Sequence, residues 1–295
     1  MIHMKTIGYL GLGIMGYGMT SNLIDKSGTT VYGFDPVPAL RERFEQRGGK
    51  AVSNAEELYR TCDIIFMCLP TNAIVKATIT DIMNTARPGT IIVDMGSTSP
   101  YVIQELHTTA LEKGFHLLDS PVSGGETGAN GGSLVIMSGG EQEVFEEVKP
   151  YLLMMGKSAT YMGSSGCGST AKIANNMMVG IHLLAMDEAY AFATKAGLDP
   201  KTLFDAIRGG FAQSAVMDLK VPKILSRDFS ASARIAVHLK DVNNAMELAE
   251  HLGVEIPMTK MVKEQMDWMY DHGMIDEDQC ALVKYYEDAM DVEVK

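Results

Sequence analysis

The sequence predicts an α/β, doubly wound sheet followed by an all-α C-terminal domain, with a long interdomain helix joining the two. Through the first 163 residues, short apolar runs alternate with helical patterns, which is typical of a parallel sheet covered on both faces. The composition changes after residue 163, and only helical patterns follow. Residues 170–196 contain no strong helix breaker other than Gly180, which indicates one helix of about 25 residues, roughly 38 Å long.

The elements of the first domain follow from these patterns in chain order. Helices are expected around Met19 and Leu23, at 39–46, after a cap at Ser53-Asn54, at 71–86, and after residues 96–100. The run 64–69, stopped by Pro70, is typical of a strand buried on both faces. Strands are expected at residues 7–10, 30–34, 51–52, 64–69, 90–94, 115–119, 135–137 and 161–162.

A glycine motif lies between the first predicted strand and the first predicted helix. Its residues are Gly11, Leu12, Gly13, Ile14, Met15 and Gly16. The first glycine allows a tight turn, the second lets the backbone approach a pyrophosphate, and the third lets the helix lie close to the sheet. The start of the helix then offers unpaired N–H groups to the phosphates. The motif in this context predicts a Rossmann-type dinucleotide-binding unit, against the alternative of a structural turn.

An acid at the end of the second strand bears on the choice of dinucleotide. Asp35 lies 19 residues after Gly16, where a carboxylate accepts hydrogen bonds from the adenosine ribose. It would repel a 2′-phosphate, so we expect NAD, with NADP as the alternative. Arg41 and Arg43 follow closely and are interpreted as a solvated helix face, although either could meet a 2′-phosphate.

The second half of the chain is predicted to be entirely helical. Beyond the long helix, helical patterns occupy residues 200–208, 216–225, 237–252 and 258–272. We therefore expect a dinucleotide-binding domain at residues 1–163 and a substrate and dimerisation domain at residues 164–295.

Composition narrows the functional class. The net charge of −12 disfavours nucleic acid and anionic membranes as partners. Four cysteines without metal spacing indicate reduced thiols in a cytoplasmic protein, and the seven histidines form no ligand-spaced set, so no metal is expected. The first strand begins by about Lys5, so no signal peptide is expected, and no apolar run approaches the length of a membrane span.

Three further clusters carry candidate chemistry. The segment 119–125, Asp-Ser-Pro-Val-Ser-Gly-Gly, follows a strand and offers a hydroxyl and bare N–H groups to a carboxylate, or forms only a glycine turn. Lys172 has Asn175 and Asn176 at i+3 and i+4, which places all three on one helix face; the alternative is an ordinary surface lysine. Residues 237–241, Val-His-Leu-Lys-Asp, form either a site or an exposed helix face.

Taken together, the motifs resemble the β-hydroxyacid dehydrogenase family. This family includes 3-hydroxyisobutyrate dehydrogenase, tartronate semialdehyde (2-hydroxy-3-oxopropionate) reductase and, more distantly, 6-phosphogluconate dehydrogenase. The matching segments lie in family order over nearly the whole chain: 11–16 with Asn22-Leu23, 119–125, Gly166-x-Gly168-x-x-x-Lys172 with Asn175-Asn176, and 239–241. Segments 209–218, 233–238 and 281–287 resemble the tartronate semialdehyde reductases most. Ser120 departs from the family's usual alanine.

The resemblance implies a role for each matching residue. Ser123, Gly124 and Gly125 would hold the substrate carboxylate. Lys172 would be the general acid and base, with Asn175 and Asn176 orienting it and the substrate. The remaining implied contacts are with the substrate, from His238 and Lys240, and with the cofactor, from Leu69, Pro70, Ser97, Thr98 and Lys240.

The expected activity is the NAD-dependent, reversible reduction of tartronate semialdehyde to glycerate by a homodimer or homotetramer. Hydride from the nicotinamide would reach the aldehyde carbon while Lys172 protonates the carbonyl oxygen. A 3-hydroxyisobutyrate dehydrogenase, or a relative acting on a larger β- or γ-hydroxy acid, is the alternative enzyme. A non-catalytic dinucleotide sensor is the alternative from another class.

Overall fold

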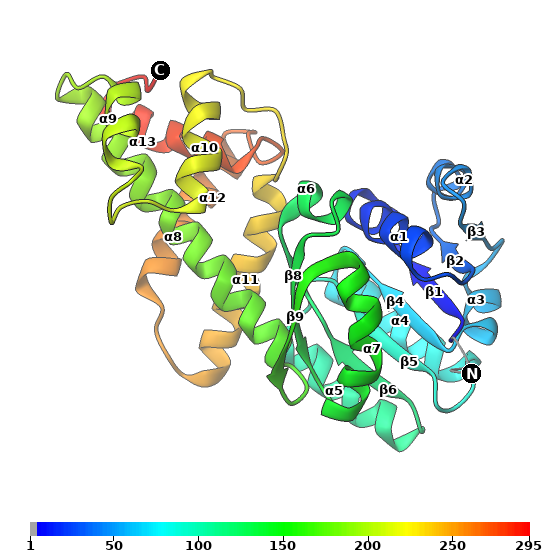
Figure 1. Ribbon diagram of the computed structural model, residues 1–295. Helices are drawn as coiled ribbons and strands as arrows, with labels where there is room; N and C mark the ends of the chain where they lie inside the picture. The colour runs from blue at the N-terminus through cyan, green and yellow to red at the C-terminus, as the bar shows by residue number, and fades with distance from the viewer. Residues whose placement is uncertain (1–4) are drawn as a thin grey trace. The chain divides into compact units, whose positions relative to one another are not determined.

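The computed structural model describes residues 5–295 and divides the chain into two compact units, Met1–Lys172 and Ile173–Lys295. The division falls within α8 (Cys167–Lys195), a continuous helix of 29 residues. The sheet-and-helix unit followed by an all-helical unit confirms the predicted fold class (Figure 1). The long helix starts three residues earlier than predicted.

The first unit is built on one sheet in which parallel strands surround the first one. The strand order is β3-β2-β1-β4-β5-β6-β8-β7, with β9 paired to β8. Strands β2 and β3 lie on one side of β1, and β4 and the strands after it lie on the other side. The strand order therefore reverses beside β1, and sheets of this kind bind ligands there, at the carboxyl ends of the strands. The strands are β1 (Ile7–Leu10), β2 (Val31–Phe34), β3 (Lys50–Ala51), β4 (Ile64–Met67), β5 (Ile91–Asp94), β6 (His116–Asp119), β7 (Val122–Ser123), β8 (Leu134–Gly139) and β9 (Gly156–Gly163).

Helices cover both faces of this sheet, as a doubly wound fold requires (Figure 1). Successive residues of a strand point to opposite faces, so Ile64 and Phe66 of β4 join one buried cluster and Ile65 and Met67 join the other. The helices are α1 (Ile14–Lys26), α2 (Pro38–Gln46), α3 (Ala55–Thr61), α4 (Asn72–Thr85), α5 (Pro100–Glu112), α6 (Gly125–Asn130) and α7 (Gln142–Met155).

The far edge of the sheet differs from the all-parallel arrangement that the sequence predicts. Strand β8 runs antiparallel to β6 and β7, and only its pairing with β9 is parallel. The two residues of β7 and the six of α6 were not predicted as a strand and a helix, because elements this short show no periodicity. The pairing therefore fixes the backbone just before Gly124 in a way that the sequence pattern did not indicate.

The second unit is a helical cluster with its own core. Buried residues from α8, α10, α11 and α12 form one cluster with those of the C-terminal segment. Gly180 lets α8 and α12 pack closely, since a Cβ there would lie 2.8 Å from Val262 Cγ1. The last two elements were not predicted. Besides α8, the elements are α9 (Pro200–Ile207), α10 (Ala215–Leu225), α11 (Ile235–Leu252), α12 (Pro257–Asp271), η1 (Gln279–Leu282) and α13 (Val283–Met290).

None of the helices among residues 5–295 is both long and apolar enough to pass through a membrane.

Candidate active site

The glycine loop between β1 and α1 has the geometry that its sequence predicts. Gly11 has a φ of +87°, and a Cβ there would lie 2.4 Å from the carbonyl oxygen of Cys68. A Cβ on Gly16 would lie 1.8 Å from the carbonyl oxygen of Gly11. Both positions therefore exclude a side chain, because another part of the backbone lies where its Cβ would be.

Gly13 differs from its two partners because it faces open space. A Cβ at Gly13 would meet no atom within 4 Å, so the protein itself does not require a glycine there. Gly13 is also the N-cap of α1, and neither a capping side chain nor an acidic residue occupies the first turn of that helix. Bare N–H groups beside an open glycine fit a pyrophosphate. These residues would thus hold the phosphates of a dinucleotide.

Asp35 is tied to the glycine loop. Its carboxylate is buried and accepts hydrogen bonds from the backbone N–H groups of Leu12, at 2.9 Å, and Val37, at 2.9 Å. Arg41 Nη1 donates to the carbonyl oxygens of Asp35 and Pro36, at 2.5 and 3.2 Å. The guanidinium of Arg43 lies 3.5 Å from the centre of the Tyr17 ring. Both arginines thus have local partners at this edge of the sheet.

The same arrangement recurs at β5. Asp94 ends the strand and accepts from Gly96 N, at 2.9 Å, and from Thr98 Oγ1, at 2.5 Å. Thr98 is buried by this contact, whereas Ser97 is half-buried. After β4, Leu69 is half-buried and Pro70 is exposed. The predicted cofactor residues therefore lie just beyond the carboxyl ends of the central strands.

Asp119 is the third acid that ends a strand, and it joins two predicted parts of the site. Its carboxylate accepts from Gly166 N at 3.0 Å and from Ser169 N at 2.7 Å, both at the start of α8. Burial raises the pKa of Asp119 to about 6, and the hydrogen bonds from Ser169 and Gly166 act in the opposite direction. The recurrence of an acid at the end of β2, β5 and β6 was a sequence signal for this role.

The predicted carboxylate-binding loop follows directly. Ser123 is half-buried at the end of β7, while Gly124 and Gly125 are exposed, with φ values of +134° and +59°. Asn22 of α1 anchors the helix that follows the loop, because its amide donates to the carbonyl oxygen of Ala129 at 2.9 Å. The loop is therefore held at both ends, by β7 and by α1.

Lys172 is the sixth residue of α8 and is half-buried. Within the first unit, α1 thus contacts the helix that follows the Ser123 loop, and Asp119 bonds to the helix turn just before Lys172. Helix geometry places Asn175 and Asn176 on the same face of α8 as Lys172.

In the second unit, the predicted residues Asn175, Asn176 and Lys240 are linked through Asp241. Asn175 Nδ2 donates to Asn176 Oδ1 at 2.9 Å, and Asn176 Nδ2 donates to Asp241 Oδ2 at 2.5 Å. Lys240 Nζ lies 3.6 Å from Asp241 Oδ1. A buried carboxylate therefore orients an amide and a lysine that the sequence singled out separately.

His238 is buried inside the helical unit. Its ring is buried, with Nε2 2.9 Å from the carbonyl oxygen of Asn176 and Nδ1 3.0 Å from Gln279 Nε2. Because the Gln279 amide donates to Nδ1, Nε2 carries the hydrogen that Asn176 accepts. His238 contacts α8 in this way, and its predicted contact with a substrate stays a prediction. Gln279, the first residue of η1, was missed, since a lone glutamine outside any predicted element gives no sequence signal.

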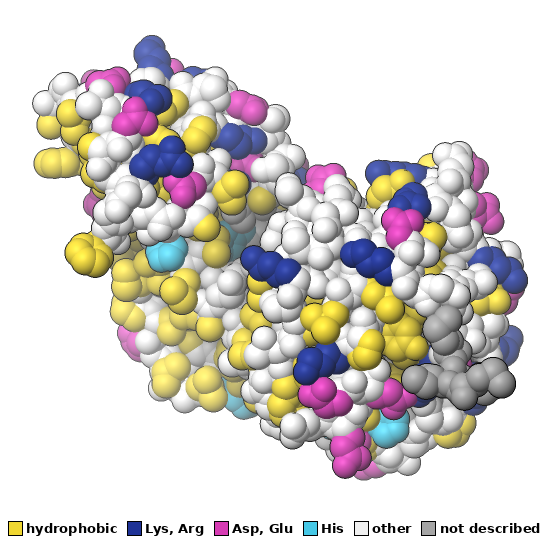
Figure 2. Space-filling view, in the orientation of Figure 1, with side chains coloured by type: hydrophobic (Ala, Val, Ile, Leu, Met, Phe, Trp, Pro, Cys, Tyr) yellow, Lys and Arg dark blue, Asp and Glu magenta, His cyan; other side chains and the backbone are white. Residues whose placement is uncertain are grey.

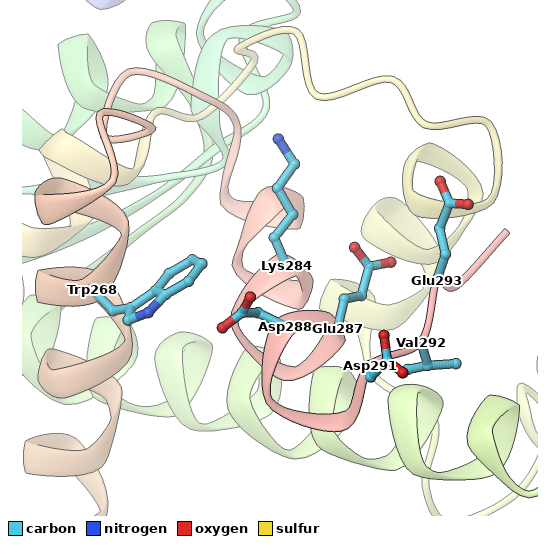
Figure 3. Close-up of a pocket in the computed structure, with 7 residues that line it drawn as sticks. All are labelled: Trp268, Lys284, Glu287, Asp288, Asp291, Val292 and Glu293. Carbon is cyan, nitrogen blue, oxygen red and sulfur yellow. The ribbon is translucent and has the colours of Figure 1, made fainter.

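A surface pocket in the helical unit has the wrong chemistry for an anionic substrate. Figure 3 shows it between Trp268 on α12 and the carboxylates of α13 and the C-terminal tail. Its lining holds one cation, Lys284, and four carboxylates. The acids are Glu287, Asp288, Asp291 and Glu293.

Comparison with known proteins identifies the family. Residues 6–163 match the family described as the NAD binding domain of 6-phosphogluconate dehydrogenase. Residues 166–286 match the family described as NAD-binding of NADP-dependent 3-hydroxyisobutyrate dehydrogenase. The chain belongs to the β-hydroxyacid dehydrogenase family. It is accordingly an oxidoreductase with a nicotinamide dinucleotide, NAD or NADP, as cofactor.

Individual members of the β-hydroxyacid dehydrogenase family match over almost their full length. The chain is 35% identical over 292 residues to 2-(hydroxymethyl)glutarate dehydrogenase of Eubacterium barkeri, covering 98% of this chain and 97% of the relative. It is also 35% identical over 284 residues to 2-hydroxy-3-oxopropionate reductase of Escherichia coli (strain K12), covering 95% and 97%. The equal identities confirm the family and leave the subgroup a prediction.

A solved structure supports the same assignment. Mycobacterium tuberculosis 3-hydroxyisobutyrate dehydrogenase with L-serine superposes with a TM-score of 0.88 at 31% identity, covering 95% of this chain and 98% of that one. Both the Rossmann-type unit and the all-helical unit therefore have the fold of this family.

Proposed function

We propose that this protein catalyses the NAD-dependent, reversible reduction of a small carboxylate-bearing semialdehyde, tartronate semialdehyde, to the β-hydroxy acid glycerate. One observation carries the proposal: within the first unit, the start of the helix bearing Lys172 is bonded to Asp119, four residues before Ser123. A proton donor and a carboxylate-binding loop thus share an anchor beside the dinucleotide-binding edge. The identity to 2-hydroxy-3-oxopropionate reductase supports the choice of substrate.

The proposed division of labour follows the two halves of the chain. Residues 1–163 bind the dinucleotide, through the glycine motif, Asp35, Leu69-Pro70 and Ser97-Thr98. Residues 164–295 supply Lys172, the asparagines and Lys240, and make the contacts between subunits.

The residues of the chain then perform the following steps. Bound NADH supplies a hydride to the aldehyde carbon. Ser123 and the N–H groups of Gly124 and Gly125 hold the substrate carboxylate, which fixes the distance from that group to the reacting carbon. Lys172 Nζ donates a proton to the carbonyl oxygen as negative charge grows there, and takes it back in the oxidation direction. Asn175 and Asn176 orient the substrate and the lysine, with Asp241 holding the Asn176 amide.

NAD is the proposed physiological cofactor. The Asp35 carboxylate lies at the ribose edge and would repel a 2′-phosphate. Arg41 bonds to backbone oxygens and Arg43 stacks on Tyr17. Both guanidinium groups thus have partners within the protein and need no 2′-phosphate, which supports the preference for NAD.

The second candidate is a 3-hydroxyisobutyrate dehydrogenase or a related dehydrogenase of a β- or γ-hydroxy acid. The 35% identity to 2-(hydroxymethyl)glutarate dehydrogenase and the TM-score of 0.88 favour it. It would use the same lysine and differ only in the substrate side chain. A non-catalytic sensor is disfavoured because Lys172 and Ser123 are both present.

A homodimer or homotetramer is proposed, with the helical unit as its interface. On the face seen in Figure 2, hydrophobic side chains gather on the helical unit. Large apolar residues of this unit are at least half exposed, and a second copy of the chain would cover them. They include Met178, Phe192, Leu252, Met258 and Met261. The cysteines form no disulfide bond within residues 5–295, which supports a cytoplasmic location.

An NADH-oxidation assay with the purified protein tests the proposal. Tartronate, methylmalonate and succinate semialdehydes are compared, each with NADH and NADPH. Fast turnover of tartronate semialdehyde with NADH is the expected result. Preference for another semialdehyde would favour the second candidate, a dehydrogenase of another β- or γ-hydroxy acid. Absence of turnover with any of them, despite NADH binding, would favour the sensor.

Replacement of the proposed acid and base tests the mechanism. Lys172→Ala is expected to lower kcat at least ~10²-fold while the Kd for NADH stays near that of the wild type, because the proton donor acts only in the chemical step. Lys195→Ala, in the last turn of the same helix, is the matched control and should keep full turnover, since Lys195 Nζ bonds to the carbonyl oxygen of Asp291. Normal turnover in Lys172→Ala would contradict the assignment.

A further inference from the structure

We propose that Asp119 is a positioning residue, which fixes the first turn of α8 on the end of the sheet and so holds Lys172 in place for proton transfer. The inference rests on the proposed function, because it assigns Lys172 its catalytic role. Asp119 itself would touch neither substrate nor cofactor.

Asp119 lies far in sequence from the helix that it caps. A capping side chain ordinarily comes from the residue just before the helix. Here the acceptor lies 47 residues before Gly166 and 50 before Ser169, on β6. The contact therefore ties the helix to the sheet, rather than only completing the hydrogen bonds of the helix end. Lys172 lies one turn beyond Ser169, so its position is set by the same contact.

The backbone packs closely around this carboxylate. A Cβ on Gly168 would lie 2.4 Å from the carbonyl oxygen of Asp119 and 2.5 Å from that of Met137. A Cβ on Gly139 would lie 2.7 Å from Asp119 Oδ1. The first turn of α8 thus rests directly on the backbone ends of β6 and β8, where only glycine allows the approach.

The burial of the Asp119 carboxylate has an energetic cost. Asp119 is 0% exposed, and among the described residues no charged side chain bonds to its carboxylate. Asp94 on β5 is its register partner, and Cys167 and Lys172 are the titratable residues in the first two turns of α8. A buried carboxylate without a cation costs stability, and such costs are typical of positions that serve function. A neutral cap would satisfy the helix end more cheaply.

Asp119→Asn in the full-length protein tests this inference with two measurements. Hydrogen exchange, followed by mass spectrometry, is expected to become faster in the peptide covering residues 166–172 and to stay unchanged at residues 11–16. The value of kcat is expected to fall about 10- to 100-fold, because a displacement on the order of 1 Å costs about that factor. The Kd for NADH should stay within about twofold, because the glycine loop has its own anchor in Asp35.

Ser120→Ala is the matched control. Ser120 is the adjacent buried residue, and its hydroxyl accepts only from Ser138 Oγ among its described side-chain contacts. This variant should leave both the exchange at 166–172 and kcat unchanged.

The outcomes separate the two proposals. Unchanged exchange at 166–172 in Asp119→Asn, or unchanged kcat despite faster exchange, would overturn the positioning role. Parallel loss of NADH binding and of thermal stability would also overturn it, since that pattern marks a merely structural residue. If exchange rises as expected but the wild type turns over no semialdehyde, the anchor stands and the proposed function fails.

Discussion

The clearest test of the dinucleotide site is Gly13→Ala, because the structure separates the protein's own requirements from those of the ligand. The backbone of Gly13 has φ −64° and ψ −165°, which alanine adopts without strain. A Cβ there would meet no protein atom within 4 Å. Alanine in place of glycine at a compatible position stabilises a protein by about 0.4–1 kcal/mol, through the unfolded chain. The melting temperature should therefore stay level or rise by roughly 1–3 °C.

Binding of NADH should respond in the opposite direction. The added methyl group would occupy the space in which the backbone approaches the pyrophosphate. Overpacking by one methyl group costs about 1–3 kcal/mol, and about 1.4 kcal/mol corresponds to a tenfold change in Kd. The Kd for NADH is thus expected to rise about 10- to 100-fold.

Titration calorimetry and thermal melting measure the two quantities on the same sample. Gly209→Ala is the matched control, because a Cβ on Gly209 also meets nothing within 4 Å and the residue lies in the helical unit. It should bind NADH as the wild type does, and its melting temperature should likewise stay level or rise by roughly 1–3 °C. Wild-type NADH affinity in a stable Gly13→Ala variant would refute the placement of the pyrophosphate at this glycine.

The remaining predictions concern two buried acids. Asp35→Ala should lower the preference for NAD over NADP, measured as the ratio of kcat/KM values. It should also lower the unfolding free energy by about 1–3 kcal/mol, because the buried Leu12 N–H loses its acceptor. An Asp35→Asn variant with unchanged cofactor preference would contradict the charge argument. Since the folded-state pKa of Asp119 is raised to about 6 from 3.8, the stability that it contributes is fully present below pH 3.8 and is lost as the pH rises through 6. The unfolding free energy of the wild type relative to Asp119→Asn should fall by about 3 kcal/mol between pH 3.5 and 7.5, measured by denaturant titration, and a flat difference would contradict the burial argument.

Local patterns predicted most of the first unit, because the relevant interactions are local. The strand at Ile7–Leu10 and the cap of α3 at Asn54 are as expected, and the side chain of Asn54 accepts from Glu57 N. The far edge of the sheet was harder to predict from the sequence. The two-residue β7 and the short α6 depend on pairing with β8, so residues 122–130 have no periodic signal of their own.

Candidate site residues were predictable where their chemistry follows from a motif. Gly11 and Gly16 have the close backbone approaches that their spacing predicts. Dinucleotide binding by Gly13 and Asp35 stays a prediction. The partners that orient the others were not predictable in this way. Gln279 reaches His238 from 41 residues away, and Asp241 reaches Asn176 from 65 residues away.

The sequence by itself determined the family, the order of the two folded units and the glycine motif, because these follow from local periodicity and from short segments with fixed spacing. Tertiary structure alone decided which buried acids hold the site together. The hydrogen bonds of Asp119 to Gly166 and Ser169 depend on the end of β6 lying beside the start of α8. Contacts between segments that are distant in sequence arise from sheet order and packing, and no local pattern encodes them.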